Sequence, residues 1–301
     1  MMPDCIWVTG ASGFIGRHLV NRLRQSAQYK VVALTRQTTF VENADHTYQV
    51  DITETDQLKS IVEAHRPVGI YHLAGMLPPA DEPDMFRVNV QGTYSLLHAL
   101  YSAGSVATTV LMLGSAAEYM PREDGYYDEG CEIGGGTPYG RSKSAQTILG
   151  ISTAKRFGID LRIARPFNLL GAGLPSALVA GNICAQLSAG KTTLRLGNVA
   201  SARDFVDVRD AIEAFIKIYD SGEPYEIYNV ATGKAVTIVE LVEEAGRVFG
   251  VSPEILSDTW LVKKQDFNIA YGNPDKLKTS VGWKPERSLA DAIKSMADNV
   301  S

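Results

Sequence analysis

The sequence predicts an α/β protein with a doubly wound parallel sheet and a smaller lobe at its C-terminal end. Up to about residue 168, short apolar segments alternate with longer segments in which apolar residues recur every three to four positions. Parallel strands need a helical crossover between them, so this alternation favours a sheet with helices on both faces. Beyond residue 168 the alternation weakens, which indicates that a second, smaller lobe begins there.

The first half is expected to hold six strands and four helical segments. Ile15, Leu19 and Leu23 recur every fourth position in the first helix, and Thr53 is a plausible N-cap of the second. The expected helices cover residues 14–26, 53–65, 84–104 and 138–158. The expected strands are CIWVTG, KVVALTR, ADHTYQVDI, VGIYHLAG, TTVLMLG and IDLRIARPFN.

The second half shows fewer regular segments. TTLRLG and YEIYNV are expected strands, DVRDAIEAFIKIYDSG is an expected helix, and the chain ends in short elements. We divide the chain into a dinucleotide-binding domain over 1–167 and a substrate lobe over 168–301. Residues 204–230 are expected to fold back on the first domain. The glycine run at 134–136 is the one segment that looks flexible.

Composition limits the classes of function. The chain has 301 residues, of which 45% are hydrophobic and 21% charged, with a formal net charge of -5. No basic stripe occurs, so nucleic acid and membranes are not expected as partners. Three cysteines without a CxxC motif and five scattered histidines predict no metal site. The N-terminus does not resemble a signal peptide and no apolar run is long enough to span a bilayer, so we expect a cytoplasmic protein.

A glycine-rich turn follows the first expected strand. Gly10, Gly13 and Gly16 form the pattern GxxGxxG just before the first helix. Glycines there permit a tight turn and close approach of the backbone to a pyrophosphate, which the helix N-terminus then binds. This strand, turn and helix predict a Rossmann-type nucleotide site. The other loop residues predicted to contact the cofactor are Ser12, Phe14 and Ile15.

The end of the second strand indicates which cofactor binds. An acidic residue at this place would bind the ribose of NAD, whereas arginine suits the 2′-phosphate of NADP. Here Thr35 stands at the expected position, Arg36 follows, and no Asp or Glu occurs from 31 to 41. The pattern therefore favours NADP, with NAD possible. Further predicted cofactor contacts are Asp51 and Ile52 near the adenine, and Leu73, Ala74 and Gly75 where the chain passes close to the cofactor.

Tyr139 and Lys143 in the run YGRSK carry the catalytic prediction. Residues four apart project from one face of a helix, so an ammonium group would lie near a phenol. A nearby cation favours the phenolate and would lower the pKa of Tyr139 toward neutrality. Tyr139 is therefore a candidate proton donor and acceptor.

Several motifs together resemble a known family. GASGFIG, HLAG, GSAAEYM, YGRSK, RPFN and RDFVDVRD are similar to motifs of the extended short-chain dehydrogenases/reductases, the NAD-dependent epimerase/dehydratase family, which act on nucleotide sugars. The resemblance covers essentially the whole chain. In the second half, RPFNLLGAG and AYGNPDKLKTSVGWKP are most similar to the GDP-6-deoxy-4-keto-D-mannose reductases of that family.

The resemblance implies roles for matching residues. Ser115 would hydrogen-bond the reacting oxygen, Tyr139 would be the acid/base, and Lys143 would bind the nicotinamide ribose and tune Tyr139. Asn89 would support the active-site helix and, with Pro166, lie among the cofactor contacts. The residues implied to hold the substrate diphosphate are Asn168, Arg203 and Lys263.

Simpler explanations remain open for some of these residues. Asn168 could cap a turn, and Arg203 could pair with Asp204 or Asp207. Glu118 is expected to be structural. Lys263 and Lys264 stand where relatives often have an arginine, which leaves the geometry of the diphosphate contact and the nucleotide base open.

These expectations combine into one function and three rivals. We expect an NADPH-preferring reductase of a nucleotide-linked 4-keto-6-deoxyhexose, a homodimer by resemblance. A 4-epimerase with tightly bound NAD would use the same three residues, Ser115, Tyr139 and Lys143, which we call the trio. A 4,6-dehydratase would need an acid/base pair after the serine, where this chain has Ala116 and Ala117. A non-enzymatic NADP sensor would have no need for the trio.

Overall fold

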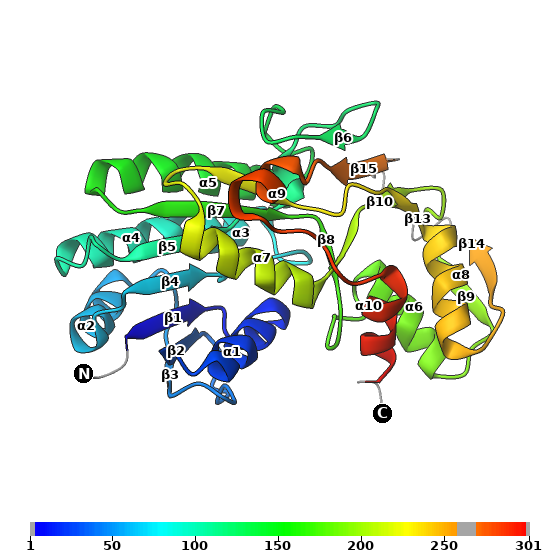
Figure 1. Ribbon diagram of the computed structural model, residues 1–301, viewed down its shortest axis with the longest axis horizontal. Coiled ribbons are helices and arrows are strands. Elements are labelled where there is room, and N and C mark those ends of the chain that lie inside the picture. Colours follow the sequence, from blue (N-terminus) through cyan, green and yellow to red (C-terminus); the bar gives the residue numbers. More distant parts are fainter. Residues whose placement is uncertain (1–3, 258–268, 299–301) are drawn as a thin grey trace. The chain divides into compact units, whose positions relative to one another are not determined.

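A computed structural model describes residues 4–257 and 269–298 (Figure 1). The chain forms two compact units. The first contains Met1–Met120, Glu132–Arg165 and Phe215–Tyr228, and the second contains Pro121–Cys131, Pro166–Ala214 and Asn229–Ser301. The functional division at residue 167 stays a prediction.

The first unit is built on a seven-stranded sheet in the order β12-β7-β5-β4-β1-β2-β3. The strand pairs from β3 to β7 are all parallel, and Figure 1 shows these strands side by side. The expected α/β fold with a parallel sheet is thus confirmed. The strands are β1 (Cys5–Thr9), β2 (Lys30–Thr35), β3 (His46–Gln49), β4 (Gly69–His72), β5 (Thr109–Leu113), β7 (Leu161–Pro166) and β12 (Ile227–Val230).

Helices cover both faces of this sheet. On one face, α2 (Thr55–His65), α4 (Gly92–Ser102) and α5 (Pro138–Phe157) share one apolar cluster with Trp7, which is fully buried. On the other face lie α1 (Phe14–Ser26) and the C-terminal part of α7 (Val208–Ser221), where the ring of Tyr219 packs against Tyr71 at 5.0 Å. Alternate residues of each strand therefore face different helices, as a doubly wound sheet requires.

The segment expected as one helix over 84–104 is divided into three parts. These are α3 (Glu82–Phe86), a π-helical turn η1 (Arg87–Gln91) and α4. Asn89 lies within the π turn and is fully buried. Single π turns widen a helix locally and are frequent at functional sites.

Two local expectations are wrong. The N-cap of α2 is Glu54, because Thr53 uses its hydroxyl to donate to Asp51 Oδ1 at 2.8 Å. The glycine run is not loose: the N–H groups of Gly134 and Gly135 donate to the Glu118 backbone oxygen at 2.9 and 3.0 Å. These bonds to a buried residue hold the loop in place.

Among its described residues, the second unit contains three small sheets, four complete helices and the N-terminal part of α7. One sheet has the order β13-β10-β15-β6, and the others pair β11 with β8 and β14 with β9. The helices are α6 (Val179–Ser188), α8 (Ile238–Phe249), α9 (Asp275–Val281) and α10 (Leu289–Ala297). The strands are β6 (Tyr126–Tyr127), β8 (Asn168–Leu170), β9 (Thr193–Leu196), β10 (Ala202–Arg203), β11 (Phe205–Asp207), β13 (Val236–Thr237), β14 (Glu254–Ser257) and β15 (Ile269–Gly272).

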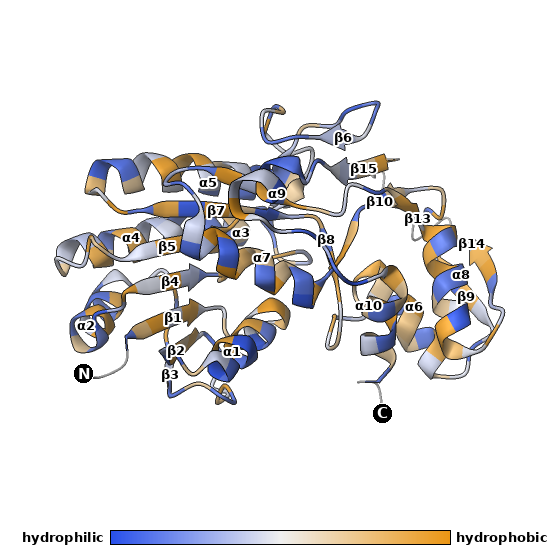
Figure 2. Ribbon diagram, viewed as in Figure 1, coloured by the Kyte–Doolittle hydropathy of each residue, from blue (hydrophilic) through white to orange (hydrophobic). Residues whose placement is uncertain are grey.

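Amphipathic helices build the core of the second unit. Figure 2 shows α8 with both orange and blue residues along its length, the pattern of a helix with one buried side. Ile183 of α6, Leu241 of α8 and Ile293 of α10 are almost fully buried in one apolar cluster. A capping box between Thr237 and Glu240 fixes where α8 begins.

Candidate functional site

The glycine turn after β1 has the geometry of a pyrophosphate cradle. Gly10 has φ 66°, and a Cβ at this position would lie 2.9 Å from the Ala74 backbone nitrogen. A Cβ on Gly16 would lie 2.3 Å from the Gly10 carbonyl oxygen, so only glycine lets α1 pack this close to the turn. Gly13 caps α1 without any side-chain hydrogen bond. The first N–H groups of α1 therefore remain available to phosphate oxygens, and these residues fit a dinucleotide.

The end of β2 carries a hydroxyl in place of a carboxylate. Thr35 is buried; its Oγ1 lies 2.7 Å from Ser12 Oγ and accepts from the Gln37 N–H at 3.1 Å. Arg36 follows as an exposed side chain. Ser12 thereby joins the glycine loop to β2. The exposed residue directly after β2, Arg36, carries a positive charge.

Asp51 and Ile52 have structural partners of their own. Asp51 accepts hydrogen bonds from Thr53 and lies 3.4 Å from Arg87 Nη1. Burial acts to raise the pKa of Asp51, but the Thr53 bonds and Arg87 outweigh it and hold this pKa below its usual value. Ile52 is buried against Gly92, where a Cβ would lie 2.5 Å from Ile52 Cγ2.

Asn89 joins the loop after β4 to helix α5. Its Oδ1 accepts from the Met76 N–H at 2.7 Å, and its Nδ2 donates to the Met76 oxygen at 3.2 Å and to Ser142 Oγ at 2.9 Å. The loop held in this way contains Leu73, Ala74 and Gly75, which were predicted to pass the cofactor. Asn89 thus ties this loop to α5, and its support of an active-site helix stays a prediction.

Ser115, Tyr139 and Lys143 meet at the carboxyl edge of the sheet. Ser115 comes two residues after β5 in extended conformation, and α5 begins at Pro138 with Thr137 as its N-cap. The Ser115 side chain lies close to the Tyr139 phenol and acts on its pKa. Because Gly10 also follows a parallel strand of this sheet, the trio and the glycine turn lie along the same edge.

The pKa of Tyr139 moves opposite to expectation. Burial raises the pKa of Tyr139 to about 12, the nearby Ser115 side chain acts to lower it, and the negative charge of Glu118 raises it. The sequence predicted a lowering by Lys143, which is wrong. Spacing places an ammonium nearby, but desolvation of a phenol has the larger effect.

Lys143 is buried and held by two neutral oxygen atoms. Its Nζ donates to the Leu113 oxygen at 2.6 Å and to Gln146 Oε1. Burial lowers the pKa of Lys143 to about 8, and the charge of Glu118 acts in the opposite direction. An ammonium group has three N–H donors, so one remains for a ligand.

A chain of buried polar side chains runs from Lys143 to the end of β1. Gln146 Nε2 donates to Thr93 Oγ1 at 2.9 Å, and Thr93 Oγ1 lies 2.9 Å from His72 Nε2. Sequence reasoning missed this network. The signals available were His72 at a strand end in HLAG and Gln146 three positions after Lys143 on the same helix.

The hydrogen-bond directions determine the tautomer of His72. Thr93 Oγ1 donates its proton to the Asn89 backbone oxygen at 2.8 Å, so it can only accept at its 2.9 Å contact with His72 Nε2. His72 Nδ1 then accepts from the Thr9 hydroxyl, 2.9 Å away. His72 therefore carries its proton on Nε2 and donates it to Thr93. Burial, and then the positive charge of Lys143, lower the pKa of His72 to about 3. A neutral His72 adds no second cation beside Lys143.

In the second unit, the residues predicted to bind the diphosphate surround Asp204. Asn168 Nδ2 donates to the Asp204 backbone oxygen at 3.1 Å, and Arg203 Nη1 donates to the Ala202 oxygen at 2.8 Å. Both acids suspected of pairing with Arg203 have other partners. The Asp204 carboxylate accepts from Thr232, Gly233 and Gly272, and the Asp207 carboxylate pairs with Arg209 at 2.6 Å. Pro166 ends β7, and Lys263 lies outside the described residues.

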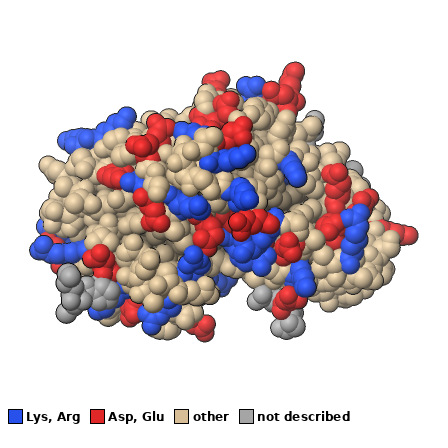
Figure 3. Space-filling model, in the orientation of Figure 1, with Lys and Arg blue, Asp and Glu red and all other residues tan. Residues whose placement is uncertain are grey.

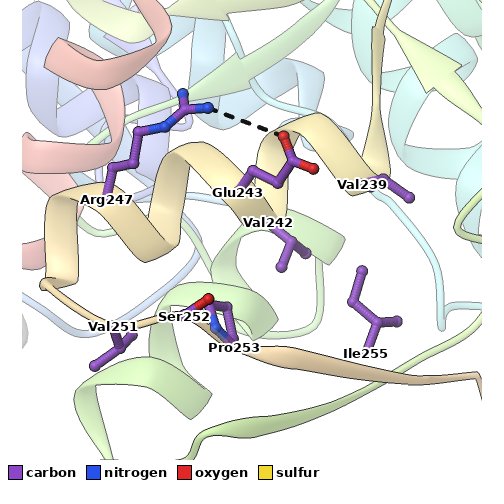
Figure 4. Close-up of a pocket in the computed structure, with 8 residues that line it drawn as sticks. All are labelled: Val239, Val242, Glu243, Arg247, Val251, Ser252, Pro253 and Ile255. Atoms are coloured by element: carbon purple, nitrogen blue, oxygen red, sulfur yellow. Dashed lines mark ion pairs between the residues drawn. The ribbon is translucent and has the colours of Figure 1, made fainter.

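Other surface features of the described residues carry no predicted chemistry. A pocket of about 440 Å³ beside α8 is lined mainly by Val239, Val242, Val251, Pro253 and Ile255, with Glu243 and Arg247 at its rim (Figure 4). Acidic and basic side chains are interspersed on the face drawn in Figure 3. Within residues 4–257 and 269–298, no cluster of three metal-binding side chains occurs and no helix is suited to crossing a membrane.

The fold and these residues define a Rossmann-type dinucleotide-binding protein. Residues 6–231 match the model of the NAD dependent epimerase/dehydratase family, and the chain therefore belongs to that family.

Two curated relatives and one solved structure are similar over almost the full chain. The GDP-6-deoxy-D-mannose reductase of Pseudomonas aeruginosa is 29% identical, over 98% of this chain and 96% of the relative. The GDP-6-deoxy-D-talose 4-dehydrogenase of Aggregatibacter actinomycetemcomitans is 26% identical, over 92% of this chain and 91% of the relative. The structure of RMD from Pseudomonas aeruginosa complexed with NADPH matches with a TM-score of 0.87 and 28% identity, covering 98% of each chain.

We predict that NADPH affinity weakens as pH rises through about 8. A lysine with a lowered pKa is charged below this value and neutral above it. If the Lys143 ammonium binds the ribose, each pH unit above its pKa weakens binding by up to about tenfold. Calorimetric titration between pH 7 and 9.5 measures this, and Lys143→Met should bind more weakly with no such pH dependence. Constant affinity of the unmodified protein across this range contradicts the prediction.

Proposed function

We propose that this protein is an NADPH-preferring reductase of a nucleotide-linked 4-keto-6-deoxyhexose. The observation that carries the proposal is that the Tyr139 phenol is buried close to the Ser115 side chain, in the unit that also contains the glycine turn and Lys143. The relatives that are named as a 6-deoxyhexose reductase and a 4-dehydrogenase support this substrate class.

The trio can protonate a developing alkoxide. When bound, the reduced nicotinamide supplies a hydride to C4 of the sugar. Tyr139 gives its proton to the C4 oxygen, and Ser115 stabilises the negative charge that develops there. With a pKa raised to about 12, the phenol is protonated at neutral pH, as a proton donor must be.

The rival functions are less well supported. An NAD-dependent 4-epimerase begins by removing a proton from the C4 hydroxyl, which requires a basic Tyr139. Arg36 at the end of β2 favours NADP over the NAD that such an epimerase keeps bound. A 4,6-dehydratase needs acid/base side chains after the serine, where a 3-10 turn begins with Ala116 and Ala117. A sensor protein has no use for the trio.

The finer cofactor assignment rests on the end of β2. The chain places buried Thr35 and exposed Arg36 where NAD-binding sites need an acid. Arg36 can form charge-assisted hydrogen bonds with a 2′-phosphate. One related structure holds NADPH, which agrees with this assignment.

The substrate diphosphate is assigned to the second unit. Asn168 and Arg203 lie on β8 and β10, and Asp204 connects them through its backbone and its loop contacts. Lys263 completes the set implied by the resemblance. We place the binding of the nucleotide-diphosphate sugar on these residues.

We also propose a cytoplasmic homodimer. Tyr94 and Tyr101 share one face of α4 and are 40% and 51% exposed, and Ile148 on α5 is 60% exposed. Exposed apolar side chains of this size on two packed helices fit a helix-to-helix contact between copies. Sedimentation of the purified protein as a monomer would contradict the dimer, and cell fractionation tests the location.

A substrate panel tests the function. GDP-, dTDP-, UDP- and CDP-linked 4-keto-6-deoxysugars are offered with NADPH, and NADPH consumption and product stereochemistry are measured. Tyr139→Phe should lower kcat by roughly 10²–10⁴ with NADPH still bound, because the ring remains and the proton donor is lost. Near-normal turnover of this variant would mean that another group protonates the sugar. No NADPH consumption by the unmodified protein would refute the reductase.

Cofactor preference depends on Arg36. The Kd for NADPH should be lower than for NADH, and Arg36→Ala should narrow the difference by roughly tenfold or more. Loss of a charge-assisted contact costs on the order of 1.5–3 kcal/mol. Affinity for NADH should hardly change, which is the internal control. Equal affinities for both cofactors in the unmodified protein would refute the preference.

Substrate anchoring depends on Arg203. Arg203→Ala should raise KM strongly and can lower kcat, because remote binding energy helps to orient the reacting carbon. NADPH affinity should stay unchanged. A lower melting temperature with unaltered KM would show a structural role instead, and Arg209→Ala, which breaks a neighbouring ion pair, is the matched control.

A further inference from the structure

Glu118 is a fully buried acid with three hydrogen-bond donors around its carboxylate. Its Oε1 accepts from the Ser115 backbone N–H at 2.7 Å. Its Oε2 accepts from Thr147 Oγ1 at 2.9 Å and from Arg165 Nη2 at 2.7 Å. A structural role alone does not explain why the chain buries a charged side chain here. Glu118 ends the short turn Ser115–Glu118 after β5, which we call the serine loop.

The bond to Ser115 closes a reciprocal pair. Ser115 Oγ accepts from the Ala117 N–H at 3.2 Å while the Glu118 carboxylate accepts from the Ser115 N–H. A capping box of this kind sets the direction of the first side chain. The same Ser115 side chain lies close to the Tyr139 phenol. Glu118 therefore determines where Ser115 Oγ lies relative to the phenol.

Glu118 is also tied to the helix that carries the other two members of the trio. Ser144 Oγ donates to the Glu118 backbone oxygen at 3.1 Å, and Thr147 donates to its carboxylate. Ser144 and Thr147 lie one and four residues after Lys143 on α5. The serine loop cannot shift along α5 without breaking these bonds.

The partner of Glu118 is a poor source of stability. Arg165 is 0% exposed, its guanidinium lies over the Tyr119 ring at 4.5 Å, and its Nε and Nη1 form no hydrogen bond of normal geometry within the described residues. Desolvation largely offsets the attraction in a buried ion pair, and unpaired buried N–H groups add a further cost. The hydrogen bonds of the Glu118 carboxylate to Ser115 and Thr147 therefore explain the buried Glu118–Arg165 pair better than a gain in stability does.

We propose that Glu118 is a positioning residue for the reaction, which holds Ser115 Oγ beside the Tyr139 hydroxyl so that both reach the same sugar oxygen. The inference rests on the proposed function in one respect, because it takes Ser115 to act on the substrate. Arg165 serves as the counter-charge of this buried carboxylate.

The charge of Glu118 has its own effect and must be separated from its hydrogen bond. Burial is the main cause for both neighbouring groups, raising the pKa of Tyr139 and lowering that of Lys143, and the charge of Glu118 acts to raise both. Arg165, Tyr119 against the Arg165 guanidinium, and the neutral His72 are further titratable groups in this region. A clean test therefore removes the Glu118–Arg165 pair in every variant compared.

Two double variants share this uncharged background. In Glu118→Gln/Arg165→Met the amide oxygen can still accept from the Ser115 N–H, and the amide NH₂ can donate to Thr147 Oγ1. In Glu118→Leu/Arg165→Met the leucine side chain has a similar size but cannot accept a hydrogen bond from the Ser115 N–H. We expect kcat of the Leu variant to be about 10- to 100-fold below that of the Gln variant, because small displacements of a reacting group are costly. The Kd for NADPH should agree within about twofold, since the glycine turn is untouched.

A double-mutant cycle decides between positioning and general destabilisation. If Glu118 acts through Ser115, the difference between the Gln and Leu variants should shrink to within about twofold in a Ser115→Ala background. Equal kcat of the two double variants, or an undiminished ratio in the Ser115→Ala background, overturns the proposal. Melting temperatures of all four proteins show that each is folded under assay conditions.

A milder pair covers the case in which the double variants do not fold. Thr147→Val removes the hydroxyl that orients the carboxylate, and Thr147→Ser retains it. We expect kcat to fall about three- to tenfold in Thr147→Val, to recover in Thr147→Ser, and to show no such difference with Ser115→Ala. Equal kcat in Val and Ser variants overturns the proposal.

Failure of the proposed function has a different signature. If the unmodified protein reduces no substrate of the panel but interconverts C4 epimers, the reductase is refuted, and the same cycles are measured on epimerisation. The Glu118 proposal is then tested by the same two ratios, which compare the rates of the Gln and Leu variants with Ser115 present and with Ser115→Ala.

Discussion

Helix α5 buries an unusual number of polar side chains, and the need to satisfy each of them organises the first unit. Ser142, Lys143, Ser144, Gln146 and Thr147 are all buried along this helix. A buried polar group without a partner costs free energy comparable to a lost hydrogen bond. Each of the five therefore bonds to a specific group, and together they reach β5, η1, α4 and the serine loop.

The same buried hydrogen bonds also determine the electrostatics of the site. Lys143 is surrounded by neutral acceptors, with Glu118 as the charge that acts on it. His72 stays neutral because it is enclosed and lies near a cation. Tyr139 keeps its proton because its phenol is desolvated. The phenol is consequently protonated at neutral pH, as the proton donor in reduction of a carbonyl has to be.

The second unit follows the same logic with a single acid at its centre. The Asp204 carboxylate accepts from the backbone N–H groups of Thr232 and Gly233 in one loop and of Gly272 at the end of β15. Burial raises the pKa of Asp204 although these hydrogen bonds act to lower it. Asn168 and Arg203 are neighbours of this acid in the strands β8 and β10, so Asp204 supports the residues assigned to the substrate.

The sequence by itself determined those features that depend on neighbours along the chain. Alternating apolar segments predict the strands and crossover helices, GxxGxxG predicts the turn with its exposed helix N-terminus, and YxxxK places two groups on one helix face. Each of these is local, so periodicity and backbone sterics suffice. The order of the strands in the sheet could not be predicted in full from the sequence. The last strand, β12, pairs with β7 although it lies more than sixty residues further along the chain.

Only the tertiary structure decided the network around the trio. His72 and Gln146 are 74 positions apart, and Glu118 and Arg165 are 47 apart, so no spacing rule connects them. The pKa of Tyr139 shows the same limit. Spacing identified the neighbouring cation, but the shift depends on how much water the fold removes from the phenol. Burial is a property of the assembled chain, since it is set by residues distant in sequence.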